Sequence, residues 1–210
     1  MKLKKQIAVI TADVVDSSLL SEAEIKFFQE KIEGYNDKTI VLKPRFYRGD
    51  SFQMAVKPHA ALLLALKFRT EMKQWKEKND VRISIGIGEV SQWNVDVLLA
   101  CGNAFERSGK NLDNLKETGL NIIVVTGNAE LDDELETYCY MADEFIKNQT
   151  AVQANLVFQM LNGTPQIEIA KMLGISQPSV SKSLKAANWK LVERFLKRYE
   201  RIIQNNYATD

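Results

Sequence analysis

A chain of 210 residues is long enough for one large domain or for a core domain with a small addition. Its apolar content of 45% and its charged content of 26% are close to globular averages, which excludes disordered and low-complexity classes. The only histidine, His59, argues against a Ser-His-Asp triad and against a histidine-rich metal site.

Net charge is +1, but the two parts of the chain differ in sign. Residues 1–150 carry 20 Lys and Arg against 23 Asp and Glu, a balance of −3, whereas residues 151–210 carry 8 against 4, a balance of +4. A basic segment of this kind is typical of nucleic-acid binding.

No apolar segment is long enough for secretion or for a membrane span, since Asp13 and Asp16 interrupt the first one. The two cysteines, Cys101 and Cys139, form no Cys-x-x-Cys motif and fit a reducing compartment. We therefore expect a cytoplasmic protein without a membrane partner.

Hydrophobic periodicity predicts alternating strands and helices over the first 127 residues. A capping box, Ser21 with Glu24, starts the first helix, and Arg48-Gly49-Asp50 forms the turn of a hairpin. The predicted strands cover residues 7–15, 39–47, 51–56, 81–87 and 121–125, and helices start at Ser21, Pro58 and Asn103. This order predicts an α+β fold, a ferredoxin-like mixed sheet with helices packed on one face, in which the first and third strands can lie side by side at the centre.

From Ala129 onward the pattern is helical to the end. The acidic segment Glu130–Glu136 is typical of a solvated helix start or a linker. Thr150 begins a helix that ends at Asn162-Gly163. We place a domain boundary near Asn148, with an α+β domain over 1–148 and an all-α helix-turn-helix domain over 149–210.

Residues 164–187 match a helix-turn-helix in caps, turn and core. Thr164 is predicted to cap the first helix with Pro165 in its first turn, and Gly174 ends that helix in a left-handed conformation. Ser176 caps the second helix, which Val180 and Leu184 anchor inward. The apolar residues predicted to be buried in the first helix and the turn are Ile167, Ile169, Ala170, Leu173 and Ile175.

The second helix, 177–187, is interpreted as a recognition helix for the major groove of duplex DNA. Gln can bond adenine with two hydrogen bonds, and Lys can reach guanine or a phosphate. The predicted DNA-binding residues are Ser176, Gln177, Ser179, Ser181, Lys182 and Lys185. The alternative is a helical hairpin used only for packing or protein contacts, which has no reason to carry lysines and no acid between Gln177 and Trp189.

The last helix carries apolar residues from Trp189 to Ile203 on one side and basic residues on much of the rest. It is interpreted first as a helix that closes the small domain's core. A dimerisation helix is the alternative, and we expect a homodimer because regulators of this kind often read paired half-sites.

Two acids in the first part, Asp13 and Asp50, could hold one or two Mg²⁺ ions against a nucleotide. The segments around them, Ile10–Ser18 and Tyr47–Val56, resemble the metal-binding strand and the Gly-Asp hairpin of class III nucleotidyl cyclases and GGDEF proteins. Residues 81–90 and 101–110 resemble the two segments that follow. Glu106 and Lys110 stand where an active cyclase has Asn and Arg, and a glutamate there would repel a developing polyanion.

Over nearly its full length the chain resembles the SatD family, which has a cyclase-like domain followed by Thr164–Lys182 as its helix-turn-helix. The resemblance implies a bacterial protein with a carboxy-terminal helix-turn-helix. From the residues we expect a DNA-binding transcriptional regulator whose cyclase-like domain is non-catalytic and serves sensing, with a small nucleotide effector, or dimerisation. One alternative is a divergent metal-dependent cyclase or nucleotide-processing enzyme that uses Asp13 and Asp50. Another is a scaffold that uses both domains only for protein contacts.

Overall fold

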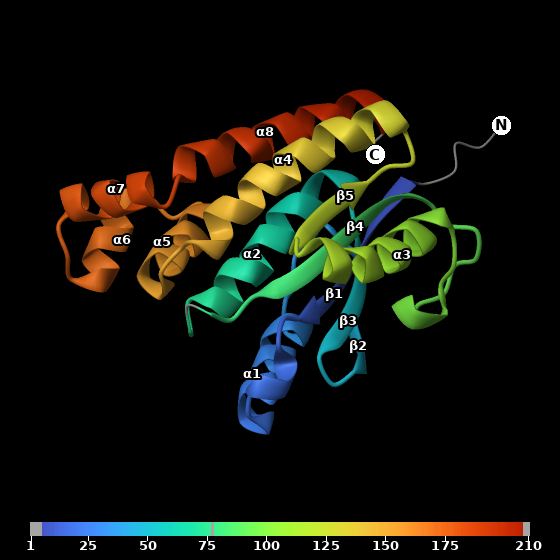
Figure 1. Cartoon of the computed structure of the whole chain (residues 1–210), viewed down its shortest axis with the longest axis horizontal. Coiled ribbons are helices and arrows are strands. Elements are labelled where there is room, and N and C mark those ends of the chain that lie inside the picture. Colours follow the sequence, from blue (N-terminus) through green and yellow to red (C-terminus); the bar gives the residue numbers. More distant parts are fainter. Residues whose placement is uncertain (1–5, 77, 208–210) are drawn as a thin grey trace.

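The computed structural model describes residues 6–76 and 78–207 (Figure 1). The strands are β1 Gln6–Val14, β2 Ile40–Arg48, β3 Ser51–Val56, β4 Val81–Glu89 and β5 Ile122–Val125. The helices are α1 Glu22–Glu33, α2 Ala61–Lys73, α3 Asn103–Thr118, α4 Ala129–Lys147, α5 Ala151–Leu161, α6 Gln166–Leu173, α7 Gln177–Ala186 and α8 Trp189–Asn206. The class is α+β, as the sequence predicts.

The described strands form one mixed sheet in the order β2-β3-β1-β4-β5. The pairs β2–β3, β3–β1 and β1–β4 are antiparallel, and β4–β5 is parallel. The first and third strands are neighbours, in agreement with the sequence prediction. This register sets Asp13 between Ser51 of β3 and Arg82 of β4.

Helices cover both faces of the sheet, so the prediction of helices on one face is wrong. The face formed by Ala8, Ile10 and Ala12 joins the large core that contains residues of α1, α2 and α4. The opposite face, with Ile7 and Val9, packs against Ala104 of α3 and the short turn before it. Figure 1 shows α3 on the side of the sheet away from α2.

Two glycines explain why α3 can lie on this second face. Gly86 and Gly88 alternate with the isoleucines of β4, and a Cβ at Gly86 would lie 2.2 Å from the Ala104 carbonyl oxygen of α3. At Gly88 a Cβ would lie 2.0 Å from the side chain of Asn103. The sequence therefore contains a signal for a second helical layer, because glycines two residues apart lie on the same face of a strand.

A buried ionic cluster attaches α4 to the sheet. The Arg69 guanidinium of α2 is fully buried, and its Nε donates to Oδ1 of Asp80 at 2.9 Å while Nη1 lies 2.7 Å from Oδ1 of Asp143 in α4. Asn121 donates its side-chain amide to Asp80 and its backbone amide to Asp143. Burial raises the pKa of Asp80, but the facing Arg69 outweighs burial and holds this pKa below its usual value.

The helices after residue 148 pack on the first part of the chain. α5 contacts α2, and α8 lies along α4 and contacts the segment before α2 (Figure 1). The hydroxyl of Tyr199 in α8 donates to the carbonyl oxygen of Pro58 at 2.6 Å, and Tyr199 is buried. The predicted boundary near Asn148 falls between α4 and α5, and the apolar core continues across it.

Candidate nucleic-acid interface

Three short helices, α5 to α7, form the end of the molecule farthest from the sheet (Figure 1). α6 ends at Gly174, which has a φ of 65°, a left-handed conformation that favours glycine. The side chain of Ser176 then accepts a hydrogen bond from the Ser179 amide and caps α7. These three features agree with the sequence predictions for the turn.

The start of α6 differs by one position from the prediction. Thr164 does not cap the helix; Pro165 occupies the N-cap position with extended backbone angles, and Gln166 is the first helical residue. Proline at this position leaves no backbone amide unsatisfied, since it has none.

The predicted inner side of α6 is only partly buried. Ile169 and Ala170 are buried, whereas Ile167 is 62% exposed, and Leu173 and Ile175 are also exposed. The physical reason is the path of α8, which turns toward α4 and does not lie over α6 (Figure 1). The sequence prediction for Ile167, Leu173 and Ile175 is therefore wrong.

The facing of α7 agrees with the prediction. Val180 and Leu184 are buried. All six predicted DNA-binding residues are exposed: Ser176, Gln177, Ser179, Ser181, Lys182 and Lys185. Ser176 and Ser179 also bond each other at 2.8 Å, so their hydroxyls serve the cap as well. Gln177 donates to Gln166 of α6 at 3.1 Å, which steadies this side chain at the first turn.

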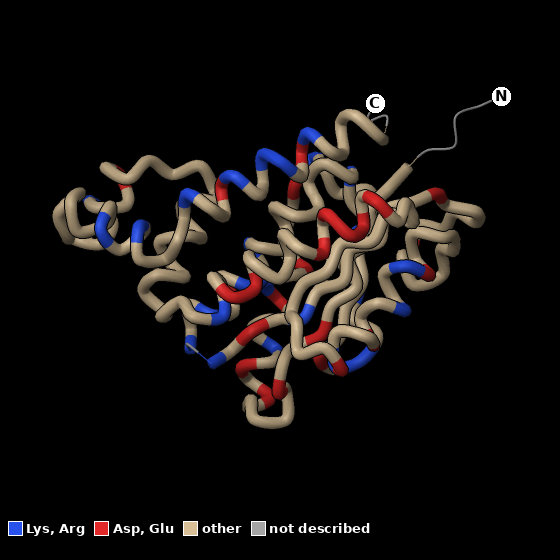
Figure 2. The backbone as a smooth tube through the Cα atoms, turned by 45° about the horizontal axis from the view of Figure 1, so that its top comes forward, with Lys and Arg blue, Asp and Glu red and all other residues tan. Residues whose placement is uncertain are grey.

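This end of the molecule carries an excess of basic residues. Between Gln149 and Val192 the chain contains four lysines and one acid, Glu168. Figure 2 shows basic positions on α7 and along α8. An exposed cationic helix can contact DNA phosphates at little desolvation cost.

Asp13 and Asp50 lie near each other at one end of the sheet, where the β2–β3 turn meets the end of β1. The Val14 amide donates to the Asp50 carbonyl oxygen at 3.1 Å. The Asp50 carboxylate accepts from Ser17 at 2.5 Å and from Ser51 at 3.1 Å. Burial raises the pKa of Asp50, but these hydroxyl donors outweigh it and leave the pKa lowered.

Two cations already engage the Asp13 carboxylate. Nη1 of Arg82 lies 3.0 Å from each Asp13 oxygen, and Nζ of Lys116 lies 3.3 Å from Oδ2. Burial raises the pKa of Asp13 and outweighs the opposite effect of these cations. Sequence reasoning missed both partners. This donor set does not fit a site in which two free carboxylates bind Mg²⁺.

The other cyclase-like positions are exposed on α3. Glu106 and Lys110 both face solvent. Glu106 lies ten residues before Lys116, about 15 Å along the helix axis, so it is remote from the Asp13 carboxylate. In residues 6–76 and 78–207, no three His, Cys, Asp or Glu side chains converge on a possible metal position.

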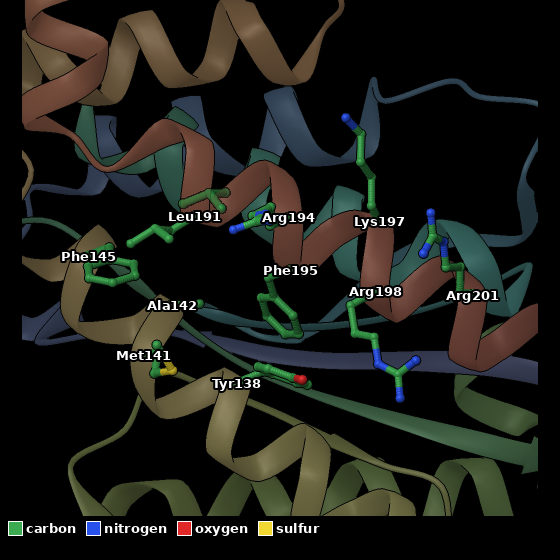
Figure 3. A pocket seen from close by; sticks show the side chains of 11 residues that line it. Tyr138, Met141, Ala142, Phe145, Leu191, Arg194, Phe195, Lys197, Arg198 and Arg201 are labelled. Carbon is green, nitrogen blue, oxygen red and sulfur yellow. The ribbon is translucent and has the colours of Figure 1, made fainter.

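A groove between α4 and α8 is a feature that sequence reasoning did not identify. Its volume is about 450 Å³, and Figure 3 shows Tyr138 of α4 beside Phe195 of α8, with several basic side chains around them. Arg198 donates to Glu134 at 2.8 Å at one end of the groove. The helical spacing of Arg194, Arg198 and Arg201 in the sequence is the signal that could have identified it.

No protein-family model, curated protein or solved structure matches this chain. Within the described residues, every helix is too short or too polar to cross a membrane.

Proposed function

We propose that the protein is a transcriptional regulator that binds duplex DNA through α7. In this proposal α6 and α7 form a helix-turn-helix, and α7 is its recognition helix in the major groove. The observation that carries the proposal is the outward face of α7, which presents Gln177, Ser181, Lys182 and Lys185 and no acid, while Val180 and Leu184 hold the helix inward.

Each of these side chains has a role in the proposal. Gln177 at the first turn of α7 is placed to read adenine, and its bond to Gln166 limits the conformations that it must lose on binding. Lys182 and Lys185 supply guanine or phosphate contacts, and Ser181 supplies a hydroxyl. The cap formed by Ser176 holds the first turn of α7 in place.

The amino-terminal part is proposed to be a non-catalytic sensing or dimerisation domain. The order β2-β3-β1-β4 with antiparallel pairing supports a ferredoxin-like core, which β5 extends at one edge. The combination of this sheet with the α6–α7 pair supports the resemblance to the SatD family. The protein is proposed to act in the cytoplasm.

The test is DNA binding by the full chain, because α5 and α8 share the apolar core of the first part. A selection from random duplex DNA should enrich a defined sequence, and the affinity for it should fall steeply with salt as phosphate contacts release counterions. Removal of Lys182 and Lys185 together should reduce the salt slope by about one for each phosphate that is no longer bound.

Two variants separate base reading from charge. Gln177→Ala should cost about 1–3 kcal/mol on the selected site and much less on random DNA. Lys43→Ala, a matched control on the exposed side of β2, should leave binding unchanged. Absence of binding even at low salt, or equal binding by the Lys182→Ala, Lys185→Ala double variant, would refute the proposal.

A further inference from the structure

The groove between α4 and α8 has an apolar end and an ionic end. Near α7 it is lined by Met141, Phe145 and Leu191, of which Met141 is 48% and Leu191 41% exposed. Toward the end of α8 it is lined by Arg198 and Arg201. An accessible apolar end of this kind indicates an interaction surface.

The outward faces of the two helices carry opposite charge. On α8, Lys190, Arg194, Lys197 and Arg201 recur at three- and four-residue intervals, and Lys190 and Arg201 are exposed. Figure 3 shows Lys197 and Arg201 extending away from Phe195. On α4, the exposed acids of the outward face are Glu130, Asp133 and Glu144. One surface therefore contains a basic helix and an acidic helix side by side.

The contacts within the chain fix which residues of the two helices lie at the same height. The helices are antiparallel: Glu134 of α4 bonds Arg198 at 2.8 Å, and Tyr138 packs on Phe195 with ring centroids 5.6 Å apart. A step forward along α4 is thus a step backward along α8. Glu130 lies level with residues 202–203 and Glu144 with residues 188–189.

We infer that this surface binds a second copy of the chain, through a two-fold axis parallel to α4 and α8. A rotation about such an axis keeps every residue at its own height and exchanges the two helices, so the partner's α4 lies over α8. The partner's Glu130 then lies within two residues, about 3 Å along the axis, of Arg201, and the partner's Glu144 equally close to Lys190. Leu191 faces the partner's Met141 at the apolar end.

The charges also exclude the other simple two-fold arrangement. An axis perpendicular to the helices would set α4 on the partner's α4 and α8 on the partner's α8, with like charges opposed along the whole contact. The inferred axis matches acid to base at both ends. The result is an antiparallel four-helix bundle, in which neighbouring helices have opposite direction and opposite charge.

The arrangement rests on the proposed function and deepens it. α6 and α7 lie at the end of the molecule where α8 begins (Figure 1), so an axis parallel to α8 brings both copies of α7 to one end of the dimer. Two recognition helices at one end can address two half-sites on one face of a duplex. A perpendicular axis would send them to opposite ends.

The area is sufficient for a specific dimer. α8 has 18 residues and α4 has 19. A face about 27 Å long and two helices, or about 20 Å, wide covers roughly 550 Å² on each copy. The total of about 1,100 Å² exceeds the minimum of about 1,000 Å² for a specific interface.

The test is the mass of the full chain by sedimentation and light scattering. The parent should be a dimer at micromolar concentration. Leu191→Glu and Arg201→Glu should each weaken the dimer by about tenfold or more, because each sets a carboxylate against an apolar or acidic partner surface. Both residues are exposed within one chain, so circular dichroism of the variants should match the parent.

A charge exchange identifies the partner of Arg201. Glu130→Arg combined with Arg201→Glu should restore the dimer, because the pair is re-formed with reversed signs. Lys43→Glu on β2 makes the same kind of change of charge away from the surface and should leave the mass unchanged. The inference would be overturned if the parent stays monomeric at high concentration. It would also be overturned if Leu191→Glu and Arg201→Glu leave the mass of the dimer unchanged.

The outcome is separable from that for DNA binding. A monomer that still binds the selected duplex would refute the inferred dimer and leave the proposed function standing. A dimer with the expected variant pattern but without DNA binding would refute the proposed function and keep the surface. A monomer whose melting temperature rises with ATP, but not in Leu191→Glu, would assign the groove to a small anionic ligand instead.

Discussion

Replacement of Arg69 by methionine should remove a large part of the free energy of unfolding. Methionine has a similar length and no charge, so the cavity is small, but Asp80 and Asp143 lose their shared cation. Their side chains are 5% and 0% exposed, so solvent cannot replace it. Removal of one partner of a buried ion pair typically costs about 3–5 kcal/mol.

The retained contacts set the size of the effect. Asp80 keeps its bonds from Asn121 and from the Val81 amide, and Asp143 keeps Lys147 at 2.7 Å. We therefore expect the lower half of that range, about 3–4 kcal/mol. In a chain of this size such a loss lowers the melting temperature by roughly 6–16 °C.

The pH dependence provides the sharper test. Arg69 holds the folded-state pKa of Asp80 below its unfolded value, so the parent has this stabilisation above about pH 4 and loses it as pH falls through the folded pKa. In Arg69→Met the cation that opposes the effect of burial on Asp80 is absent, so we expect the pKa of Asp80 to rise and its protonation to stabilise the variant as pH falls. The difference between parent and variant should shrink from about pH 7 to about pH 4.

Urea unfolding followed by circular dichroism at several pH values measures this difference. Arg45→Met, which breaks an exposed pair with Asp96 away from the α4–α8 surface, is the control and should behave like the parent. A loss below about 1 kcal/mol in Arg69→Met, or a difference that does not change with pH, would refute the reasoning.

Two further predictions follow from the same structure. Val180→Asp should unfold the α5–α7 region because it buries an unpaired charge at a fully buried position; hydrogen exchange should show lost protection there, and a variant with parental protection would contradict the facing of α7. Mg²⁺ with nucleoside triphosphates should not raise the melting temperature, because Arg82 and Lys116 already engage Asp13. A rise that Asp13→Asn abolishes would instead support the metal-site hypothesis and the enzyme alternative.

Local signals predicted most of the elements. The capping box of Ser21 and Glu24, the hairpin around Gly49 and the left-handed Gly174 each depend on residues close in sequence, and all are present. The two-fold alternation of β4 predicted its buried isoleucines. The glycines between them also predict that a helix packs on this face, because a glycine inside a strand often marks a place where another backbone approaches closely.

Errors arose where burial depends on an element far along the chain. Ile167, Leu173 and Ile175 have the pattern of an inner helix side, yet their exposure is decided by the direction of α8. The pairing of Arg69 with Asp143 joins residues 74 positions apart and has no local pattern at all. Periodicity indicates which side of a helix is apolar, but the burial of that side depends on whether another element packs against it.

The same limit decides how Asp13 should be interpreted. The predicted arrangement, in which the first strand lies beside the hairpin, brings Asp13 and Asp50 to one end of the sheet, and both do lie there. The role of a carboxylate, however, depends on which charges reach it across the sheet. Arg82 is its neighbour only through the β1–β4 register, and Lys116 arrives from the far end of α3. With two cations bound, Asp13 ties β4 and α3 to β1, and the cation site that its sequence motif suggests is filled by the protein itself.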